Sequence, residues 1–447
     1  LPISWTSSTT SGVSAGIVIS AGTGATVDCR NNTITNISIL GSTTSVGHSF
    51  LGIENTTGGT ITIQGNTIGS TSVANAINLA TATSGNLVQA FTGIRNALSS
   101  SPTLTIASNT IANINNATSS TSASSVTFGI RVGLGMATVS GNIIRNITTA
   151  STGISGGTTP TLAGIMWASS TVGASQIISG NTVHSLFNIA ASANVSVYGI
   201  YYAGAASGTN SVTKNNVHSL SIVSTSATAD LRGIVLASGL VAITNNMVRL
   251  GINAAGDPLT TGIQMTGIYD VVSTSGSSID HNSVFIGGTG VGTQAGATYA
   301  FRSEQNTNTR LYRNNIFVNE RSNETTGGKH YAVRVTGTGV NPTGLTLNYN
   351  IYRASGTGSV FGYYNTDQAN FADWKAATGQ DVNSLDANPL FTNTTGNSSA
   401  VDLHLQVGTP AESAGTLIAT VTDDFDSQTR ADLSPVDIGA DAGDYGT

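Results

Sequence analysis

The chain has 447 residues, only 9% of them charged, and a formal net charge of −6. Residues 1–229 hold two acids and five bases, whereas residues 381–447 hold eleven acids and one base. The nearly neutral first half excludes the basic stripe that nucleic-acid binding requires. No apolar run reaches the roughly 18 residues that a membrane-spanning helix needs.

A Gly-Ile pair, or a close variant, recurs about every 35 residues. Such a period is typical of solenoids and other repeat arrays. Helical periodicity is nearly absent, and the abundant Thr, Val and Ile favour strands. The repeat therefore predicts an all-β array of about eleven turns, whose landmarks begin at Gly16, Gly52, Gly93, Gly129, Gly164, Gly199, Gly233, Gly267, Ala300, Ala332 and Gly362.

Each pair is followed by a second landmark, in which an Asn precedes Ile or Val by two residues. An apolar residue three positions before the Asn, such as Cys29, fits an inward-facing strand position ahead of a bend. In a parallel coil, the Asn side chains of successive turns lie about 4.8 Å apart, where their amides can hydrogen-bond. We therefore predict a buried Asn ladder of Asn32, Asn66, Asn109, Asn142, Asn181, Asn215, Asn246, Asn282 and Asn314.

The repeat stops near residue 365, and residues 370–377 read as a short helix. The end of a solenoid exposes apolar core and unpaired strand edges that need a cover. We expect residues 366–447 to form an acidic C-terminal cap on the repeats of residues 1–365. Its predicted apolar cover consists of Phe371, Trp374, Leu390, Phe391, Leu403 and Leu405.

The two landmarks resemble the repeats of secreted bacterial right-handed parallel β-helix proteins of the pectate-lyase-like superfamily, over residues 10 to about 365. Residues 386–391, 402–405, 408–411 and 437–441 resemble the closing segment of bacterial surface β-helix proteins, although Glu412 and Ser413 replace the usual Ile-Asp. The resemblance implies a right-handed parallel β-helix with a C-terminal cap, secreted or displayed at a cell surface. The chain begins at Leu1 without a charged and apolar leader, which suggests a mature or excised product.

The residues that follow the Gly-Ile pairs form a predicted outward column rich in Arg and Tyr. Aromatic faces and guanidinium groups suit sugars or a partner surface, although they also pack along a β-face without a ligand. The predicted binding surface consists of Arg95, Arg131, Trp167, Tyr201, Tyr269, Arg302 and Arg334.

Candidate catalytic and metal-binding residues are few. A lyase needs a basic residue near a substrate carboxylate, and a hydrolase needs paired carboxylates. The best cluster for either is Asp270, Arg302, Glu304 and Arg334, but their offsets within the repeat do not place all four on one face. Asp423, Asp424 and Asp426 are candidate Ca²⁺ ligands, with solvated acidic loops as the alternative. No other cofactor is predicted.

The superfamily includes lyases, hydrolases and adhesins, so the fold does not choose an activity. Because acids are scarce in the repeats, we expect a non-catalytic structural or adhesive surface protein. Its expected partners are other copies of itself, joined end to end into a filament or matrix, or cell-surface components including glycans. The alternatives are a polysaccharide lyase or hydrolase and a glycan-binding module.

Overall fold

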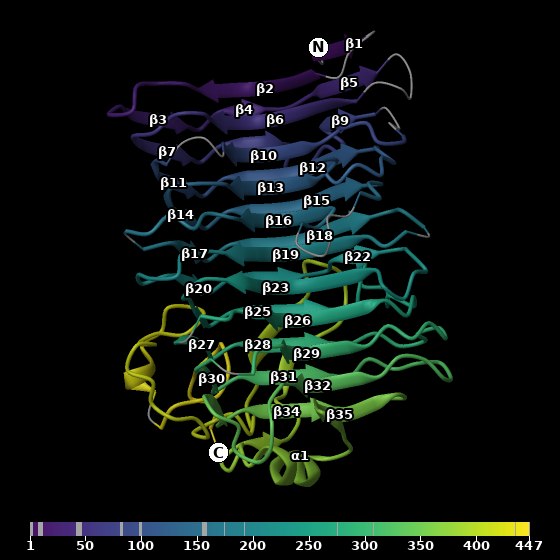
Figure 1. The fold of residues 1–447 in the computed structure, drawn as a ribbon, viewed down its shortest axis with the longest axis vertical. Coiled ribbons are helices and arrows are strands. Elements are labelled where there is room, and N and C mark those ends of the chain that lie inside the picture. Colours follow the sequence, from purple (N-terminus) through teal and green to yellow (C-terminus); the bar gives the residue numbers. More distant parts are fainter. Residues whose placement is uncertain are drawn as a thin grey trace. The chain divides into compact units, whose positions relative to one another are not determined.

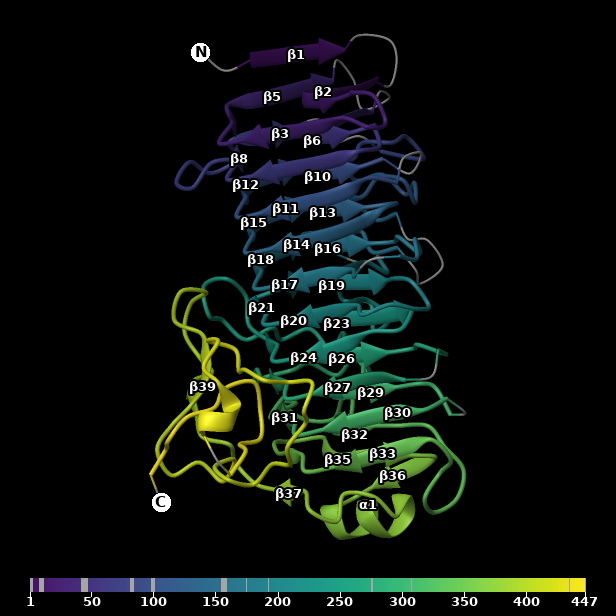
Figure 2. The same cartoon turned by 90° about the vertical axis from the view of Figure 1, so that its left-hand side faces the viewer.

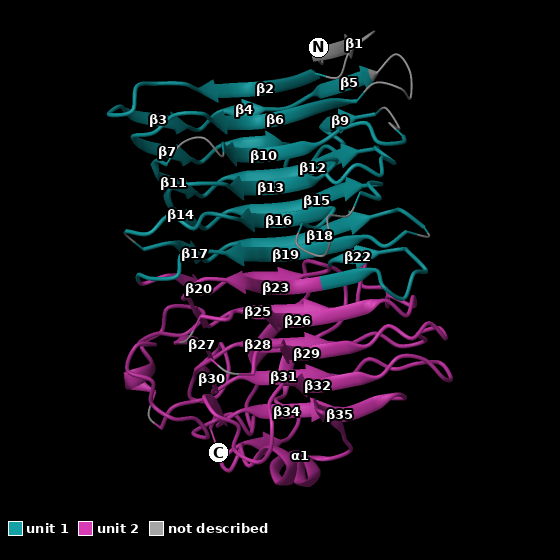
Figure 3. Cartoon of the chain, viewed as in Figure 1, with its two compact units in different colours: residues 1–208, 220–231 teal, residues 209–219, 232–447 magenta. Residues whose placement is uncertain are grey.

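A computed structural model of the chain is all-β, with 45% strand and 3% helix, and forms a parallel β-solenoid of about 10 turns. The predicted fold class is therefore confirmed, with about one turn fewer than the eleven landmarks suggest. Two compact units are coloured in Figure 3: residues 1–208 with 220–231, and residues 209–219 with 232–447. The structure describes residues 3–7, 12–41, 47–80, 84–97, 101–153, 159–173, 175–191, 193–274, 276–306, 308–433 and 435–446.

In unit 1, each turn contributes strands to three sheets, and neighbouring turns pair in parallel (Figure 1). The first sheet holds β1 (Ile3–Ser7), β4 (Thr33–Ile34), β5 (Ile37–Gly41), β8 (Thr67–Gly69), β9 (Ile77–Leu79), β12 (Thr110–Asn116), β15 (Ile143–Thr149), β18 (Thr182–Asn188) and β22 (Ser221–Ile222). The second holds β2 (Gly12–Ile19), β6 (His48–Asn55), β10 (Phe91–Asn96), β13 (Thr127–Val132), β16 (Leu162–Trp167) and β19 (Ser196–Ala203). The third holds β3 (Thr26–Arg30), β7 (Thr60–Gln64), β11 (Thr103–Ala107), β14 (Met136–Ser140) and β17 (Ile177–Ser179).

Unit 2 repeats this arrangement and adds the C-terminal segments. Its first sheet holds β21 (Asn216–His218), β25 (Met247–Leu250), β28 (Ser283–Ile286), β31 (Ile316–Asn319), β34 (Ile351–Ala354) and β37 (Leu385–Asp386). Its second holds most of β23 (Asp230–Ser238), then β26 (Gln264–Asp270), β29 (Thr298–Ser303), β32 (His330–Arg334), β35 (Ser359–Tyr364) and the antiparallel β36 (Thr366–Gln368). Its third holds β20 (Ser211–Thr213), β24 (Ala242–Thr244), β27 (Ser277–Asp280), β30 (Arg310–Arg313) and β33 (Leu345–Asn348).

The Gly of each Gly-Ile landmark marks a close approach inside the second sheet. A Cβ atom on Gly129 would lie 2.6 Å from both the Gly164 carbonyl oxygen and Ile144 Cγ2, so a larger residue would require these neighbours to shift. The strand pairing also skips this residue: Phe128 pairs with Ala163 and Ile130 with Ile165. The residues on either side of the Gly are thereby released from strict inward and outward alternation.

The predicted Asn ladder is present in both units. In four successive pairs of each unit, the side-chain amide donates to the Oδ1 atom of the next Asn at 2.9–3.1 Å. Each Oδ1 atom also accepts from the backbone N–H of the preceding ladder Asn. The members are Asn32, Asn66, Asn109, Asn142 and Asn181 in unit 1, and Asn215, Asn246, Asn282, Asn315 and Asn350 in unit 2.

One predicted member of the ladder is wrong. Asn315, not Asn314, continues from Asn282, because the Oδ1 atom of Asn315 accepts from the Asn282 backbone and side chain at 3.0 Å. Asn314 instead lies one position earlier, with a left-handed φ of 55°. Cys29 is buried, as predicted, and burial raises the pKa of its thiol.

A left-handed residue precedes every ladder Asn, and its identity differs between the units. In unit 1, φ is between 53° and 66° at Asn31, Gly65, Ser108, Gly141 and Gly180. In unit 2, φ is 55° or 56° at Lys214, Asn245, His281, Asn314 and Tyr349. A non-glycine residue in this conformation costs about 1–2 kcal/mol. Backbone strain is therefore present at all five of these positions in unit 2, whereas glycine avoids it at three of the five positions in unit 1.

Contacts with the tail accompany this strain. Lys214 Nζ contacts Asp423 Oδ2 at 2.5 Å, and Asn245 Nδ2 donates to the Asp423 carbonyl at 2.8 Å. Asn314 donates to the Thr416 carbonyl at 2.7 Å and accepts from its N–H at 3.0 Å. Hydrogen bonds of this kind each contribute about 1 kcal/mol, which offsets the strain.

The C-terminal residues cover unit 2 in two places. Helix α1 (Phe371–Thr378) begins at the N-cap Asn370, ends at Gly379 and lies beside β35 and β36 (Figure 2). The side chain of Trp374 is fully buried. Its Nε1–H donates to Asp381 at 2.8 Å, and Asp381 also accepts from Asn350, the last ladder Asn. The helix and Asp381 therefore close the last turn.

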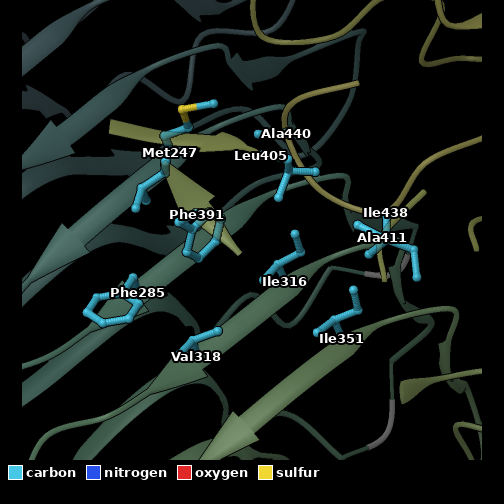
Figure 4. Close-up of a cluster of buried hydrophobic side chains, with 11 residues drawn as sticks. Met247, Phe285, Ile316, Val318, Ile351, Phe391, Leu405, Ala411, Ile438 and Ala440 are labelled. Atoms are coloured by element: carbon cyan, nitrogen blue, oxygen red, sulfur yellow. The ribbon is translucent and has the colours of Figure 1, made fainter. Parts of the chain in front are cut away.

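The remaining tail packs on the side of the solenoid rather than on its end, which corrects the expected position of part of the cover. Figure 4 shows outward side chains of the first sheet packed against tail residues. The tail includes the antiparallel pair β38 (Phe391–Asn393) and β39 (Asp402–Leu405) and the 3₁₀ turn η1 (Arg430–Asp432). The cluster consists of Met247, Phe285, Ile316, Val318, Ile351, Phe391, Leu403, Leu405, Ala411, Ile438 and Ala440.

Among the described residues, no helix has both the length and the apolar character needed to cross a membrane.

Candidate functional site

The candidate site is the outer face of the second sheet in unit 2, which we call the Tyr–Arg face. It comprises Arg232, Tyr269, Tyr299, Arg302, Glu304, Tyr331, Arg334 and Tyr363, from β23, β26, β29, β32, β35 and the residue that follows β29. The strands that carry it are stacked in Figure 1. The pairing register places Tyr269, Arg302, Arg334 and Tyr363 in one column.

Rings and guanidinium groups alternate along this face. The rings of Tyr299 and Tyr331 stack in parallel with centroids 5.0 Å apart. Arg302 lies 4.9 Å from the centroid of Tyr269 and 5.1 Å from that of Tyr299. Arg334 lies 5.6 Å from the centroid of Tyr299. Tyr299 and Tyr331 are only 7% and 4% exposed, so these contacts are largely desolvated and contribute about 0.5–2 kcal/mol each.

The stack extends to a further residue at each end. Arg232 lies 4.1 Å from the centroid of Tyr269, and Arg334 lies 4.9 Å from that of Tyr363. The whole arrangement therefore spans five strands of the second sheet in unit 2. Because Arg302 and Arg334 each lie against two rings, their guanidinium groups are positioned before any ligand arrives.

Charge on the Tyr–Arg face is positive. Glu304 pairs with both Arg302 and Arg334, the second contact being 3.2 Å. These side chains keep 19–22% of their surface exposed. Two guanidinium groups, those of Arg302 and Arg334, thus share one carboxylate. An excess of positive charge beside aromatic rings suits a ligand that carries carboxylates and apolar ring faces.

Asp367 lies at the edge of the face. It forms an ion pair with Lys329, and Tyr331 donates to it at 2.9 Å. Burial alone would raise the pKa of Asp367, but the hydrogen bonds from Lys329 and Tyr331 lower it below its usual value. Asp367 is therefore ionised and occupied by its own neighbours near neutral pH.

Asp270 is separate from the other three candidate catalytic residues. Its side chain is 3% exposed and accepts from the Tyr312 hydroxyl at 2.6 Å and from the Val272 N–H at 2.9 Å. Burial raises its pKa. The structure brings Arg302, Glu304 and Arg334 together but leaves Asp270 in the interior, so the four do not form one acid–base group.

In unit 1, the corresponding column holds Arg95, Arg131 and Tyr201. Arg95 lies 3.6 Å from Glu54 and pairs in register with Arg131, and Arg131 lies 5.9 Å from the ring centroid of Phe128. Burial lowers the pKa of Arg131, and the neighbouring charge of Arg95 lowers it further. The ring of Tyr201 stacks on Tyr198 at 6.4 Å.

The expected surface position of Trp167 is wrong. Its side chain is fully buried, contacts the Tyr202 ring with centroids 6.0 Å apart and donates to the Ser169 carbonyl at 3.3 Å. Trp167 is the second residue after Ile165, so it returns to the inward side of the strand. Its role is in the core.

Sequence reasoning missed Tyr299, Tyr331, Arg232 and Tyr363. The first three directly precede the landmarks at Ala300, Ala332 and Gly233, where strict alternation places a side chain inward. The skipped residue in the strand pairing turns them outward instead. Tyr363 belongs to the column because Val333 pairs with Gly362 and Arg334 with Tyr363. An aromatic or Arg residue before the landmark, repeated in neighbouring turns, is the signal that could have found them.

The three candidate Ca²⁺ ligands do not share a site. Asp423 contacts Lys214, whereas Asp424 is buried and accepts from the N–H groups of Gln428 at 2.7 Å and Ala442 at 3.2 Å. Asp426 contacts His404 at 2.9 Å. Each of the three carboxylates is therefore engaged by a different partner.

Comparisons with known proteins found no family model that matches the chain and no match among curated proteins.

Proposed function

We propose that this chain is a non-catalytic, extracellular adhesive protein that binds acidic glycans through the Tyr–Arg face. The observation that carries the proposal is the alternation of Tyr rings and guanidinium groups over five successive strands. A carboxylated polysaccharide offers both complementary features, because its sugar rings present apolar faces and its carboxylates accept paired N–H groups. The resemblance to bacterial surface β-helix proteins supports an extracellular setting.

The state of the acidic residues supports a binding rather than a catalytic role. Glu304 is engaged by two guanidinium groups, and Asp270 is buried behind the sheet. Glycoside hydrolysis needs two carboxyl groups on opposite sides of the scissile bond. Neither of these carboxylates is placed for such a pair.

The closed last turn argues against growth of a filament by stacking turns at that end. Asp381 and Ser384 occupy the hydrogen-bonding positions that the next ladder Asn would fill on Asn350. Trp374 lies against Gly362, because a Cβ on that glycine would be 2.6 Å from its ring. We therefore favour adhesion by individual chains over end-to-end assembly.

The proposal can be tested by measuring binding of the full chain to polygalacturonate, hyaluronate and uncharged dextran by isothermal titration calorimetry. We expect binding to the two acidic polymers only, weakening as salt concentration rises. Arg334→Ala and Tyr269→Ala should each weaken it by about tenfold, the loss of roughly 1.4 kcal/mol. Arg353→Ala is the matched control, because Arg353 lies in the first sheet and pairs with Glu320.

Two results would overturn the proposal. One is an absence of binding to either acidic polymer, or binding that the face variants leave unchanged. The other is turnover: release of unsaturated products or new reducing ends, lost in Arg302→Ala or Asp270→Asn, would make the chain an enzyme.

A further inference from the structure

A second cluster of functional groups lies in the tail, outside the Tyr–Arg face. His404 is in β39, Asp426 follows in a turn, and Asp441 lies in the last segment. One potential ligand atom of each residue lies within 4.8 Å of the corresponding atoms of the other two. A metal with bonds of about 2.0–2.2 Å to such ligands holds them roughly 3.5 Å apart, so small side-chain movements suffice.

The cluster is a mixed donor set with orienting neighbours, rather than a group of acids alone. Asp402 Oδ1 lies 2.5 Å from His404 Nδ1, which leaves Nε2 facing Asp426 at 2.9 Å. Metal-binding histidines commonly have such a carboxylate on their other ring nitrogen, because it fixes the tautomer and the ring orientation. The imidazole ring also meets the Phe425 ring in a T-shaped contact, with centroids 5.6 Å apart.

The carboxylate of Asp441 is also fixed, by two hydrogen bonds. Its Oδ2 atom accepts from the Leu405 N–H at 2.8 Å and from the Tyr445 hydroxyl at 2.6 Å. Its side chain is buried, whereas Asp426 is exposed. The cluster therefore combines one fixed carboxylate and one fixed imidazole with a carboxylate that can adjust from the surface.

The nearest basic residue in sequence, Arg430, makes its hydrogen bonds outside the cluster, although its charge also interacts with Asp441. Arg430, the one basic residue of residues 381–447, donates to the carbonyls of Gly439 at 2.8 Å and Ala440 at 3.0 Å, and to the Asn245 side chain at 2.9 Å. Three carboxylates, those of Asp402, Asp426 and Asp441, thus surround one imidazole. A divalent cation would balance most of that negative charge.

We propose that His404, Asp426 and Asp441 bind a divalent transition-metal ion of the Zn²⁺ class, with Asp402 and Tyr445 as positioning residues. An imidazole and two carboxylates suit Zn²⁺ better than Ca²⁺, which takes oxygen ligands in larger number. The ion would link β39 to residues 426 and 441 and so fasten the tail to itself. This site is independent of glycan binding by the Tyr–Arg face.

The test uses the full chain after dialysis against EDTA, titrated with ZnCl₂, MnCl₂ or CaCl₂ in calorimetry and in thermal unfolding. We expect one Zn²⁺ per chain and a melting temperature that rises with free Zn²⁺ concentration. His404→Gln and Asp426→Asn should each weaken binding at least tenfold, and Asp402→Asn by about 10–100-fold. Asp432→Asn, in η1, is the matched control in the tail and should bind as the unchanged chain does.

Three results would overturn the proposal: no stoichiometric uptake of Zn²⁺, uptake that Asp426→Asn leaves unchanged, or preferential binding of Ca²⁺. Asp426 is the decisive position because it is exposed, so its replacement by Asn leaves the fold intact even if His404→Gln does not. Arg334→Ala should retain Zn²⁺ binding, so the failure of one proposal leaves the other testable.

Discussion

Replacing Asn282 by Ala should be among the most destabilising single changes in unit 2. The side chain is fully buried. Its Nδ2 group donates to the Ile243 carbonyl at 2.9 Å, the Asp280 carbonyl at 3.0 Å and Asn315 Oδ1 at 3.0 Å. Its Oδ1 atom accepts from Asn246 N at 3.1 Å and Asn246 Nδ2 at 2.9 Å. Alanine removes all five hydrogen bonds.

The expected loss in the free energy of unfolding follows from the buried groups that lose a hydrogen-bond partner. The buried N–H of Asn246 loses the acceptor it has in the structure, which costs about 1–3 kcal/mol, and the other broken contacts add about 1 kcal/mol each where no substitute partner exists. Because Asn246 Nδ2 keeps its bonds to two carbonyls, we expect a total of about 3–5 kcal/mol.

The measurement is the free energy of unfolding in urea, with hydrogen exchange at Asn246 as a local readout because repeat arrays need not unfold in two states. Asn115→Ala is the matched control. Asn115 also bonds an Asn of the neighbouring turn, Asn78, at 2.8 Å, but this pair is partly exposed to water. It should lose less than about 1 kcal/mol. Equal losses for the two variants, or a loss under about 1 kcal/mol for Asn282→Ala, would refute the role assigned to the ladder.

Three further predictions concern other positions. Burial lowers the pKa of His330 to about 4, so the unfolded chain gains a proton as pH falls from 6.5 to 4 and the native chain does not. The free energy of unfolding should therefore fall by up to roughly 3 kcal/mol over that pH range. In urea titrations, the free energy of unfolding of His330→Gln should depend less steeply on pH, and an unchanged pH dependence would contradict this. Trp374→Ala should cost about 3–5 kcal/mol and open the last turn to limited proteolysis, whereas exposed Val382→Ala should change neither measurement. Gly129→Ala should lower the thermal midpoint by several degrees through the clash with Ile144, and an unchanged midpoint would show that the second sheet can yield there.

The repeat, the ladder and the cap helix were predictable because each depends on local spacing. The period of the Gly landmarks sets the turns, and each Asn position follows from strand geometry on both sides of one bend. The choice between Asn314 and Asn315 was not predictable in that way. Both residues are Asn, and only the left-handed backbone at the first of them decides which side chain points inward.

Two other features depend on long-range packing. The skipped residue at the landmark glycines arises where the second sheet approaches the first, so a period of two residues misplaces the side chains before it. The side position of the tail depends on an apolar patch formed by residues far apart in sequence, such as Met247, Ile316 and Leu405. Neither feature can be predicted from the sequence of a single segment.

The left-handed residues that precede the ladder Asn residues in unit 2 provide the positions where the tail binds. Lys214, Asn245 and Asn314 provide side chains that hold residues 416–430, whereas the matching positions at Gly65, Gly141 and Gly180 of unit 1 provide none. A tail grafted beside these glycines would meet backbone without side chains and should not bind there. We therefore expect duplication or loss of turns to be tolerated more readily beside Gly65, Gly141 and Gly180 than beside Lys214, Asn245 and Asn314.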